Sequence, residues 1–505
     1  MGIEILDTTL RDGEQTSGVS FSNIEKLGIA RLILKELHVP RIEIASARVS
    51  SGEYDSVKEV CEWAKENGYL NKVEILGFID NGASIKWIKD VGGTVVNLLA
   101  KGSERHCREQ LNKTPEEHLA DVQREIRFAV ESGLEVNLYL EDWSNGMKNS
   151  AQYVYFMVDN LKDYPVRRFM LPDTLGIFNP NQVYGYGKHM VEKYPTLHFD
   201  FHGHNDYDLA TANSFAAGLA GMHGIHCTIN GLGERAGNAP LSSVVAIVHD
   251  MLKLDTGIDE TKINKVSRIV ESFSGVVIPS NKPIIGDNVF TQCAGVHADG
   301  DNKNNLYFND LLPERFGRER EYALGKTSGK ANIKKNLETL GIELSEKNIR
   351  KITQRIIELG DKKEIVTPAD LPYIISDVLK HDIRHNKVKI INYALSLSQG
   401  LRPTATIKLE INGIEYQESA VGDGQYDAFM KAIKKIYVDR LKKPFPRLTN
   451  YFVNIPPGGQ TDALVQTIIS WDFNGHSLKT RGLDADQTEA AIQATIKMLN
   501  IIDNI

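Results

Sequence analysis

Short apolar runs alternate with longer amphipathic segments over the first half of the chain. Eight of these runs are spaced by about 20 to 40 residues, the interval of a strand followed by a crossover helix. A closed (β/α)8 barrel is therefore predicted. A doubly wound sheet is the alternative, but no GxGxxG motif follows the first run. The predicted strands are Ile3–Leu6, Arg41–Ala45, Val73–Phe78, Thr94–Leu99, Glu135–Leu140, Arg168–Leu171, His198–His202 and Gly224–Ile229.

Helix-start signals lie between these runs. Ser22–Glu25 reads as a capping box and is followed by apolar residues at helical spacing. Thr114 precedes Pro115, which suits the first position of a helix. Both signals support helices that cross from one strand to the next.

The pattern changes after the barrel segment. We divide the chain into a barrel (1–272), a lid or linker subdomain (273–330), a helical subdomain (331–386) and a C-terminal domain (387–505). Residues 280–330 read as loop, and His381–Lys387 reads as a linker. The last part reads as two strand-strand-helix repeats, which suggests a duplicated α+β domain for regulation or dimerisation. Its predicted strands are Val388–Leu397, Thr404–Ile411, Asn450–Ile455 and Asp462–Trp471, with one helix opened by the stretch Gly422–Ile433 and another that follows the stretch Gly482–Ala491.

Composition excludes several classes of protein. The 505 residues are 41% hydrophobic and 25% charged, with a net charge of −7, so no broad basic surface for nucleic acid is expected. No apolar run reaches the roughly 20 residues that span a membrane. Met1 leads directly into a strand, and the four cysteines form no CxxC pair. We expect a cytoplasmic protein with reduced thiols.

Charged and imidazole groups gather where the predicted strands end. Arg11 and Asp12 follow the first strand, and His202 and His204 end the seventh. Residues two apart in a strand share a face, so the two histidines are placed to bind one divalent metal with Asp12 as a neighbouring ligand. Asn238, in the glycine-rich loop after strand eight, offers a neutral oxygen. The alternatives are that the histidines are structural and that the loop is only a connection.

The motifs together resemble the acyl-CoA Claisen condensation family, which contains the isopropylmalate, homocitrate and citramalate synthases. Within it the chain most resembles the citramalate synthases, through Val39–Ser50, Tyr139–Gly146 and Phe201–Asp208. That resemblance implies condensation of pyruvate with acetyl-CoA, on the pyruvate route to isoleucine. The family blocks are Leu6–Gln15, His202–Asp206, Gly231–Asn238, Gly295–Gly300 and Leu324–Gly329.

The resemblance also implies roles. A divalent ion, Mg2+ or Mn2+ with Zn2+ or Co2+ as alternatives, would be held by the metal group Asp12, His202, His204 and Asn238. Arg11 would stabilise the alkoxide that forms on carbon–carbon bond formation. Thr174 would bind the substrate carboxylate and Glu141 would support the site. His297 is implied as the base, helped by Tyr322, with both supplied either by the same subunit or by the partner subunit. The residues implied near acetyl-CoA are Asp299, Asn305 and Tyr307.

Specificity is expected to depend on Leu76, Leu99 and Tyr139. These bulky groups near strand ends would leave a small apolar pocket that favours a methyl over an isopropyl side chain, unless they only fill the barrel. The alternatives are a 2-isopropylmalate synthase using 2-oxoisovalerate, a lyase of the same barrel type, and a non-catalytic amino-acid sensor. The resemblance further implies a homodimer and a branched-chain effector, isoleucine, bound to the C-terminal domain.

Overall fold

The computed structural model describes residues 2–301, 303–361, 366–379, 387–454, 465–474 and 476–503. It separates into two compact units. The first is Met1–Phe290 with Asn309–Glu319, and the second is Thr291–Phe308 with Arg320–Ile505.

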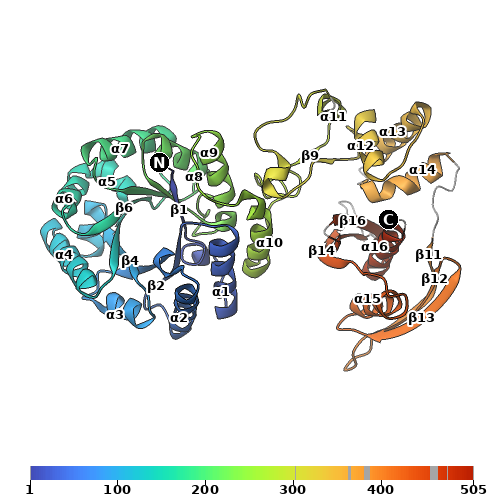
Figure 1. Ribbon diagram of the computed structural model, residues 1–505, viewed down its shortest axis with the longest axis horizontal. Coiled ribbons are helices and arrows are strands. Elements are labelled where there is room, and N and C mark those ends of the chain that lie inside the picture. The colour runs from blue at the N-terminus through green and yellow to red at the C-terminus, as the bar shows by residue number, and fades with distance from the viewer. Residues whose placement is uncertain are drawn as a thin grey trace. The chain divides into compact units, whose positions relative to one another are not determined.

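The first unit is a closed barrel of eight parallel strands in sequence order, ringed by helices (Figure 1). Strand β1 pairs with both β2 and β8, which closes the ring and excludes the doubly wound sheet. The predicted barrel is confirmed, with small shifts at strand ends. The strands are β1 (Glu4–Asp7), β2 (Arg41–Ser46), β3 (Val73–Phe78), β4 (Val95–Lys101), β5 (Glu135–Glu141), β6 (Val166–Asp173), β7 (Phe199–Gly203) and β8 (Gly224–Cys227).

The surrounding helices begin where the capping signals predict. The side chains of Ser22 and Thr114 each accept a hydrogen bond from the backbone N–H three residues on, and the glutamate at that position accepts one from the backbone N–H of the cap residue. The apolar helix faces pack on the outer faces of the strands to form one core. The helices are α1 (Asn23–Arg31), α2 (Ser51–Glu66), α3 (Ala83–Asp90), α4 (Pro115–Glu131), α5 (Trp143–Asn149), α6 (Ala151–Leu161), α7 (Pro180–Lys193), α8 (Ala210–Leu219), α9 (Leu241–Asp250) and α10 (Ile263–Ser274).

The inner faces of the strands carry many polar groups. Near the amino-terminal end, Arg41 lies 2.5 Å from Asp200 and 3.2 Å from Glu74. Arg168 lies 2.8 Å from Glu4. A buried charge requires a partner, and each of these charges has one. A network of ion pairs therefore fills the barrel near the amino-terminal ends of the strands, and the candidate site residues lie at the opposite end.

The second unit begins with small elements. Strands β9 (Thr291–Gln292) and β10 (Glu321–Tyr322) pair in parallel. Within the stretch predicted as loop, the structure forms a short helix, α11 (Gly295–Asp301), so that prediction is wrong there. The predicted helical segment is confirmed where it is described, and Ile333, Ile352 and Leu371 help to form its core. Its helices are α12 (Lys330–Thr339), α13 (Glu346–Asp361) and α14 (Leu371–Leu379).

The C-terminal part holds two antiparallel three-stranded sheets, each followed by a helix. The prediction of two strands in each repeat is wrong by one strand, whereas a helix is found in the second repeat after Gly482, as predicted. Asn412-Gly413 and Asn474-Gly475 in the sequence are hairpin turn signals that mark the missing strands. The elements are β11 (Val388–Ser396), β12 (Thr404–Ile411), β13 (Ile414–Val421), α15 (Gln425–Lys434), β14 (Arg447–Asn454), β15 (Val465–Phe473), β16 (His476–Asp484) and α16 (Gln487–Ile502).

Both helices of this part pack on the sheets around a shared core that includes Phe429, Ile433, Trp471 and Leu499. The duplicated α+β architecture is thus confirmed. Of the predicted linker only Lys387 lies within the described residues, and the beginning of the predicted strand Asp462–Trp471 lies outside them. Across the described part of the chain, no helix combines the length and apolar character needed to cross a membrane. The four cysteines are free.

Candidate active site

Three side chains with metal-binding atoms meet at the mouth of the barrel. Asp12 follows β1, His202 lies in β7 and His204 follows it. Ligand atoms of the three residues all lie within 4.8 Å of one another. The Nε2 atoms of His202 and His204 are 3.3 Å apart, and they lie 3.2 and 3.8 Å from Oδ2 of Asp12. All three residues are buried. The structure thus brings together the group that the spacing of the sequence predicts.

Asn238 lies beside this group. An isolated bridge pairs it with His204, and its Oδ1, like Oδ1 of Asp12, is buried without a hydrogen-bond partner among the described residues. Gly233 permits the close approach, since a Cβ there would lie 2.1 Å from Nδ2 of Asn238 and 3.3 Å from Oδ1 of Asp12. Two imidazoles, a carboxylate and an amide oxygen fit a divalent cation.

The protonation states suit such a cation. Burial lowers the pKa of His202 and His204, that of His204 to about 4, so both rings are neutral near pH 7, as metal binding requires. Burial alone would raise the pKa of Asp12, but Arg11 and the hydrogen bond from His202 hold that pKa well below its ordinary value. The group presents one negative charge and two neutral donors.

Arg11 is held beside the metal group by three contacts. Its Nε lies 2.5 Å from Oε2 of Glu43, its Nη1 lies 2.9 Å from Oδ2 of Asp12, and its Nη2 lies 3.4 Å from the Tyr139 hydroxyl. Burial opposes its charge, but the two carboxylates outweigh this and raise its pKa. A fixed cation at this place can stabilise an oxyanion.

Leu76, Leu99 and Tyr139 pack together inside the barrel. They form a small cluster with Leu6 and Met170 that is separate from the main core. Leu99 is paired in register with Tyr139, which in turn pairs with Met170. Since the Tyr139 hydroxyl reaches Arg11, this apolar wall borders the polar site.

Glu141 and Thr174 also lie at strand ends. Glu141 is the last residue of β5 and forms an ion pair with Lys101, its register neighbour at the end of β4. The Thr174 hydroxyl accepts a hydrogen bond from the backbone N–H of Asp142 at 2.9 Å. Its own proton is therefore available to another acceptor, such as a carboxylate.

His297 and Tyr322 belong to the second unit, whereas the metal group belongs to the first. The His297 ring lies on α11 with its centroid 4.3 Å from that of Tyr307. The Tyr322 hydroxyl donates to Asp301 at 3.3 Å, and burial and that carboxylate raise the pKa of Tyr322. The roles of these two residues stay predictions.

The remaining acetyl-CoA candidates lie in the same unit. Asp299 forms an ion pair with Lys303 at 2.6 Å, and both side chains are exposed. Asn305 adopts a left-handed backbone conformation, with φ of 56°. Asp299, Asn305 and Tyr307 are accessible to solvent. Their contact with acetyl-CoA also stays a prediction.

Glu43, a carboxylate near the end of the predicted second strand, belongs to the site although no role was predicted for it. Besides Arg11, this buried carboxylate accepts a hydrogen bond from Asn97 at 2.7 Å, and Asn97 accepts one from Asn137 at 2.8 Å. The signal in the sequence is a glutamate within the otherwise apolar run Ile42–Ala45.

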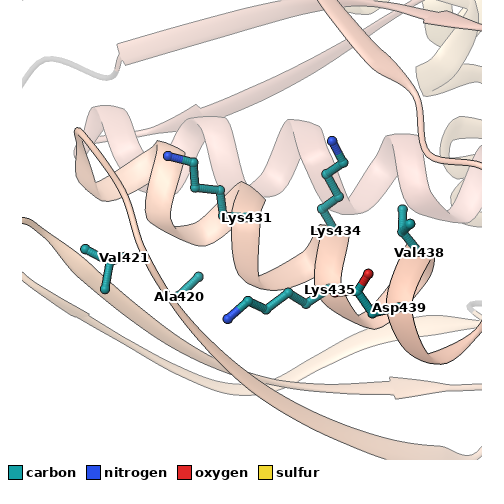
Figure 2. Close-up of a pocket in the computed structure, with 7 residues that line it drawn as sticks. All are labelled: Ala420, Val421, Lys431, Lys434, Lys435, Val438 and Asp439. Carbon is teal, nitrogen blue, oxygen red and sulfur yellow. The ribbon is translucent and has the colours of Figure 1, made fainter.

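A groove of about 430 Å3 lies in the C-terminal part (Figure 2). Lys431 forms an ion pair with Asp427 at 2.6 Å, and Lys435 donates to the Ser419 carbonyl at 2.8 Å. Figure 2 shows the ammonium groups of its lysines spread apart rather than directed at one point. This groove therefore offers no converging set of groups comparable to the barrel mouth. Its lining residues are Ala420, Val421, Lys431, Lys434, Lys435, Val438 and Asp439.

Asp7, at the end of β1, is expected to make the free energy of unfolding depend on pH. Burial raises its pKa to about 7, and its Oδ2 has no hydrogen-bond partner among the described residues. The pKa of Asp7 is higher in the folded state than in the unfolded state. Its contribution to stability is therefore fully present at pH values below the unfolded-state pKa and is lost as the pH rises through the folded-state pKa of about 7. We expect Asp7→Asn to raise the free energy of unfolding by about 1–3 kcal/mol at pH 8, with little or no gain at pH 4.

Thermal unfolding at both pH values, with a chelator present, measures this effect. Asp121→Asn is a matched control, because Lys113 and Arg124 outweigh burial and lower the pKa of that carboxylate. A gain for Asp7→Asn that is equal at pH 4 and pH 8 would contradict the assignment.

Comparison with known proteins agrees with this geometry. The HMGL-like family model matches residues 2–270, the homocitrate synthase post-HMGL domain-like model matches 284–364, and the LeuA allosteric (dimerisation) domain matches 365–502. The (R)-citramalate synthase CimA of Methanocaldococcus jannaschii is 34% identical over 508 residues, covering 100% of both chains. The 2-isopropylmalate synthase of the same organism is 33% identical over 508 residues, covering 99% of this chain and 94% of that protein.

The chain therefore belongs to the HMGL-like family. It is an acyl-CoA-condensing transferase that carries a LeuA allosteric (dimerisation) domain. The family predicted from the motifs is confirmed. Because the identities to the two synthases are nearly equal, the choice of 2-oxo acid has to be argued from the pocket.

Proposed function

We propose that this protein is an (R)-citramalate synthase that condenses acetyl-CoA with pyruvate and releases citramalate and CoA. The observation that carries the proposal is the apolar wall of Leu76, Leu99 and Tyr139 beside Arg11. Three bulky groups leave room for a methyl group more readily than for an isopropyl group, and steric exclusion discriminates more strongly than the loss of one contact.

The residues of the chain divide the reaction between them. His297, with Tyr322, takes a proton from the methyl group of the acetyl thioester, and the resulting carbanion attacks the ketone carbon of pyruvate. The ketone oxygen becomes an alkoxide that Arg11 stabilises, while Thr174 donates to the pyruvate carboxylate. Glu141 supports the site, and Asp299, Asn305 and Tyr307 contact the CoA. The alkoxide takes up a proton to become the hydroxyl group of the product, and water then cleaves the thioester to a carboxylate and the CoA thiol.

The metal group Asp12, His202, His204 and Asn238 would hold the divalent ion, with Mg2+ or Mn2+ proposed first. When bound, such an ion polarises the ketone as a Lewis acid. The fit rests on the two neutral imidazoles and on the buried Oδ1 atoms of Asp12 and Asn238, which find no hydrogen-bond partner in the part of the chain that the structure describes.

A thiol reagent that detects free CoA tests the proposal with pyruvate, 2-oxoisovalerate and 2-oxoglutarate in turn. We expect kcat/KM for pyruvate to exceed that for 2-oxoisovalerate by at least about 10-fold. A clear preference for 2-oxoisovalerate would instead make the enzyme a 2-isopropylmalate synthase. Release of pyruvate from a hydroxyacyl-CoA would indicate a lyase, and no turnover at all would favour the amino-acid sensor.

Regulation follows from the matched C-terminal domain. We infer that the protein is a homodimer and that isoleucine binds the LeuA allosteric (dimerisation) domain, which supports feedback on the pyruvate route to isoleucine. The same CoA assay with added isoleucine or leucine distinguishes the effector. We also propose that the enzyme acts in the cytoplasm.

A further inference from the structure

A buried chain of polar groups crosses the barrel beneath the candidate site. Nη2 of Arg41 lies 2.5 Å from Oδ2 of Asp200, which lies 3.2 Å from Nε2 of His226. Nδ1 of His226 lies 3.1 Å from the Tyr139 hydroxyl, which lies 3.4 Å from Nη2 of Arg11. Each of the five residues comes from a different part of the barrel wall, so the chain exists only once the barrel is closed.

The protons of this chain can be placed from its chemistry. Asp200 is paired with Arg41 at 2.5 Å, and as a carboxylate it accepts from Nε2–H of His226 at 3.2 Å. A neutral imidazole carries one proton, which this contact places on Nε2. Its Nδ1 then carries a lone pair, which can only accept.

The Tyr139 hydroxyl has one proton and two acceptors near it. These are Nδ1 of His226 at 3.1 Å and Oε2 of Glu43 at 3.4 Å. If the hydroxyl donated its hydrogen bond to Glu43, the buried Nδ1 of His226 would have no donor, and an unsatisfied buried acceptor lowers stability. Donation to His226 satisfies both groups and leaves Oε2 of Glu43 to Nε of Arg11 at 2.5 Å.

We propose that His226 is a positioning residue whose Nδ1 accepts a hydrogen bond from the Tyr139 hydroxyl. This hydrogen bond holds Tyr139 in the wall of the 2-oxo acid pocket, and it leaves Glu43 to contact Arg11. The inference rests on the proposed function, because the wall is taken to select the substrate. His226 is held in turn by Asp200, which also accepts from His198 at 2.8 Å. The floor of the barrel thereby orients a residue at its mouth.

Two amide substitutions separate the two nitrogens of His226. Asparagine places its amide near the position of Nδ1, and its oxygen can still accept a hydrogen bond from Tyr139. Glutamine places its amide near the position of Nε2, where it can contact Asp200 but not Tyr139 as well. We expect His226→Gln to lower kcat/KM for pyruvate about 10- to 100-fold and to raise the ratio of 2-oxobutanoate to pyruvate turnover at least about fivefold. In His226→Asn, both kcat/KM for pyruvate and the turnover ratio should stay much closer to their wild-type values.

A double-mutant cycle tests the link to Tyr139. Tyr139→Phe should reproduce the specificity change of His226→Gln, and the double variant should be no worse than the more impaired single variant, within about threefold. Mn2+ affinity, measured by calorimetry without substrate, should stay within about threefold of wild type in His226→Gln, since His226 is outside the metal group. Should the glutamine variant fail to fold, the asparagine and phenylalanine variants still carry the test.

Three results would overturn the inference. Equal losses in the asparagine and glutamine variants with an unchanged substrate ratio would make His226 merely structural. Multiplicative losses in the double variant would separate it from Tyr139. A parallel fall in Mn2+ affinity would mean that it acts through the ring of His202, 5.5 Å away. All variants are compared with wild type on its best 2-oxo acid, so a wild type that rejects pyruvate refutes the proposed function without deciding the role of His226.

Discussion

Replacing Asp12 with asparagine is expected to lower kcat for CoA release by at least about 1,000-fold. Asp12 is the only carboxylate in the group with His202 and His204 found among the described residues, and its Oδ2 also accepts from Arg11 at 2.9 Å. Asparagine keeps the shape but removes the negative charge that a divalent cation needs. The variant should also lose the rise in melting temperature that Mn2+ gives the wild type.

The matched control is Asp121→Asn on α4, whose carboxylate pairs with Lys113 and Arg124. It removes one aspartate from the same unit, and in the described part of the chain this aspartate belongs to no group of three metal-binding residues, so the variant should keep both kcat and the response to Mn2+. If Asp12→Asn kept its Mn2+ response, the metal assignment would fail even if activity were lost. Circular dichroism confirms that each variant is folded before comparison.

The metal group was predictable because it depends on two local rules. Alternation along a strand puts His202 and His204 on one face, and closure of the barrel brings the end of β1 close to β7, with only β8 between them. Asn238 follows from the same reasoning, because its loop leaves β8. The barrel itself was predictable from the spacing of apolar runs, since each strand needs one crossover helix.

Glu43 and His226 were not predictable in the same way. Each lies in a strand with apolar neighbours, and its partner lies far away in the sequence. Glu43 meets Arg11, which follows the neighbouring strand β1, and His226 meets Tyr139, which lies on β5 across the barrel. Such contacts depend on strand stagger, which no local pattern reveals. By contrast, strands β13 and β16 were within reach of local rules, because Asn412-Gly413 and Asn474-Gly475 mark their hairpins.

Replacing Arg11 with lysine is expected to lower kcat about 100- to 1,000-fold, equivalent to roughly 3–4 kcal/mol of transition-state stabilisation. Lysine keeps the charge but not the planar fork that contacts Glu43, Asp12 and Tyr139 together. Because the alkoxide forms only in the reaction, KM for pyruvate should change much less than kcat. Steady-state CoA release at saturating acetyl-CoA measures both constants.

Arg168→Lys provides the control for this substitution. Arg168 is also a largely buried barrel arginine, but it pairs with Glu4 at the opposite end of the strands, at 2.8 Å. Its replacement should lower the melting temperature while kcat stays within about threefold of wild type. Equal losses of kcat in the two variants would mean that buried arginines act here only through stability. A loss confined to Arg11→Lys would locate the developing negative charge beside Asp12, where the guanidinium is held.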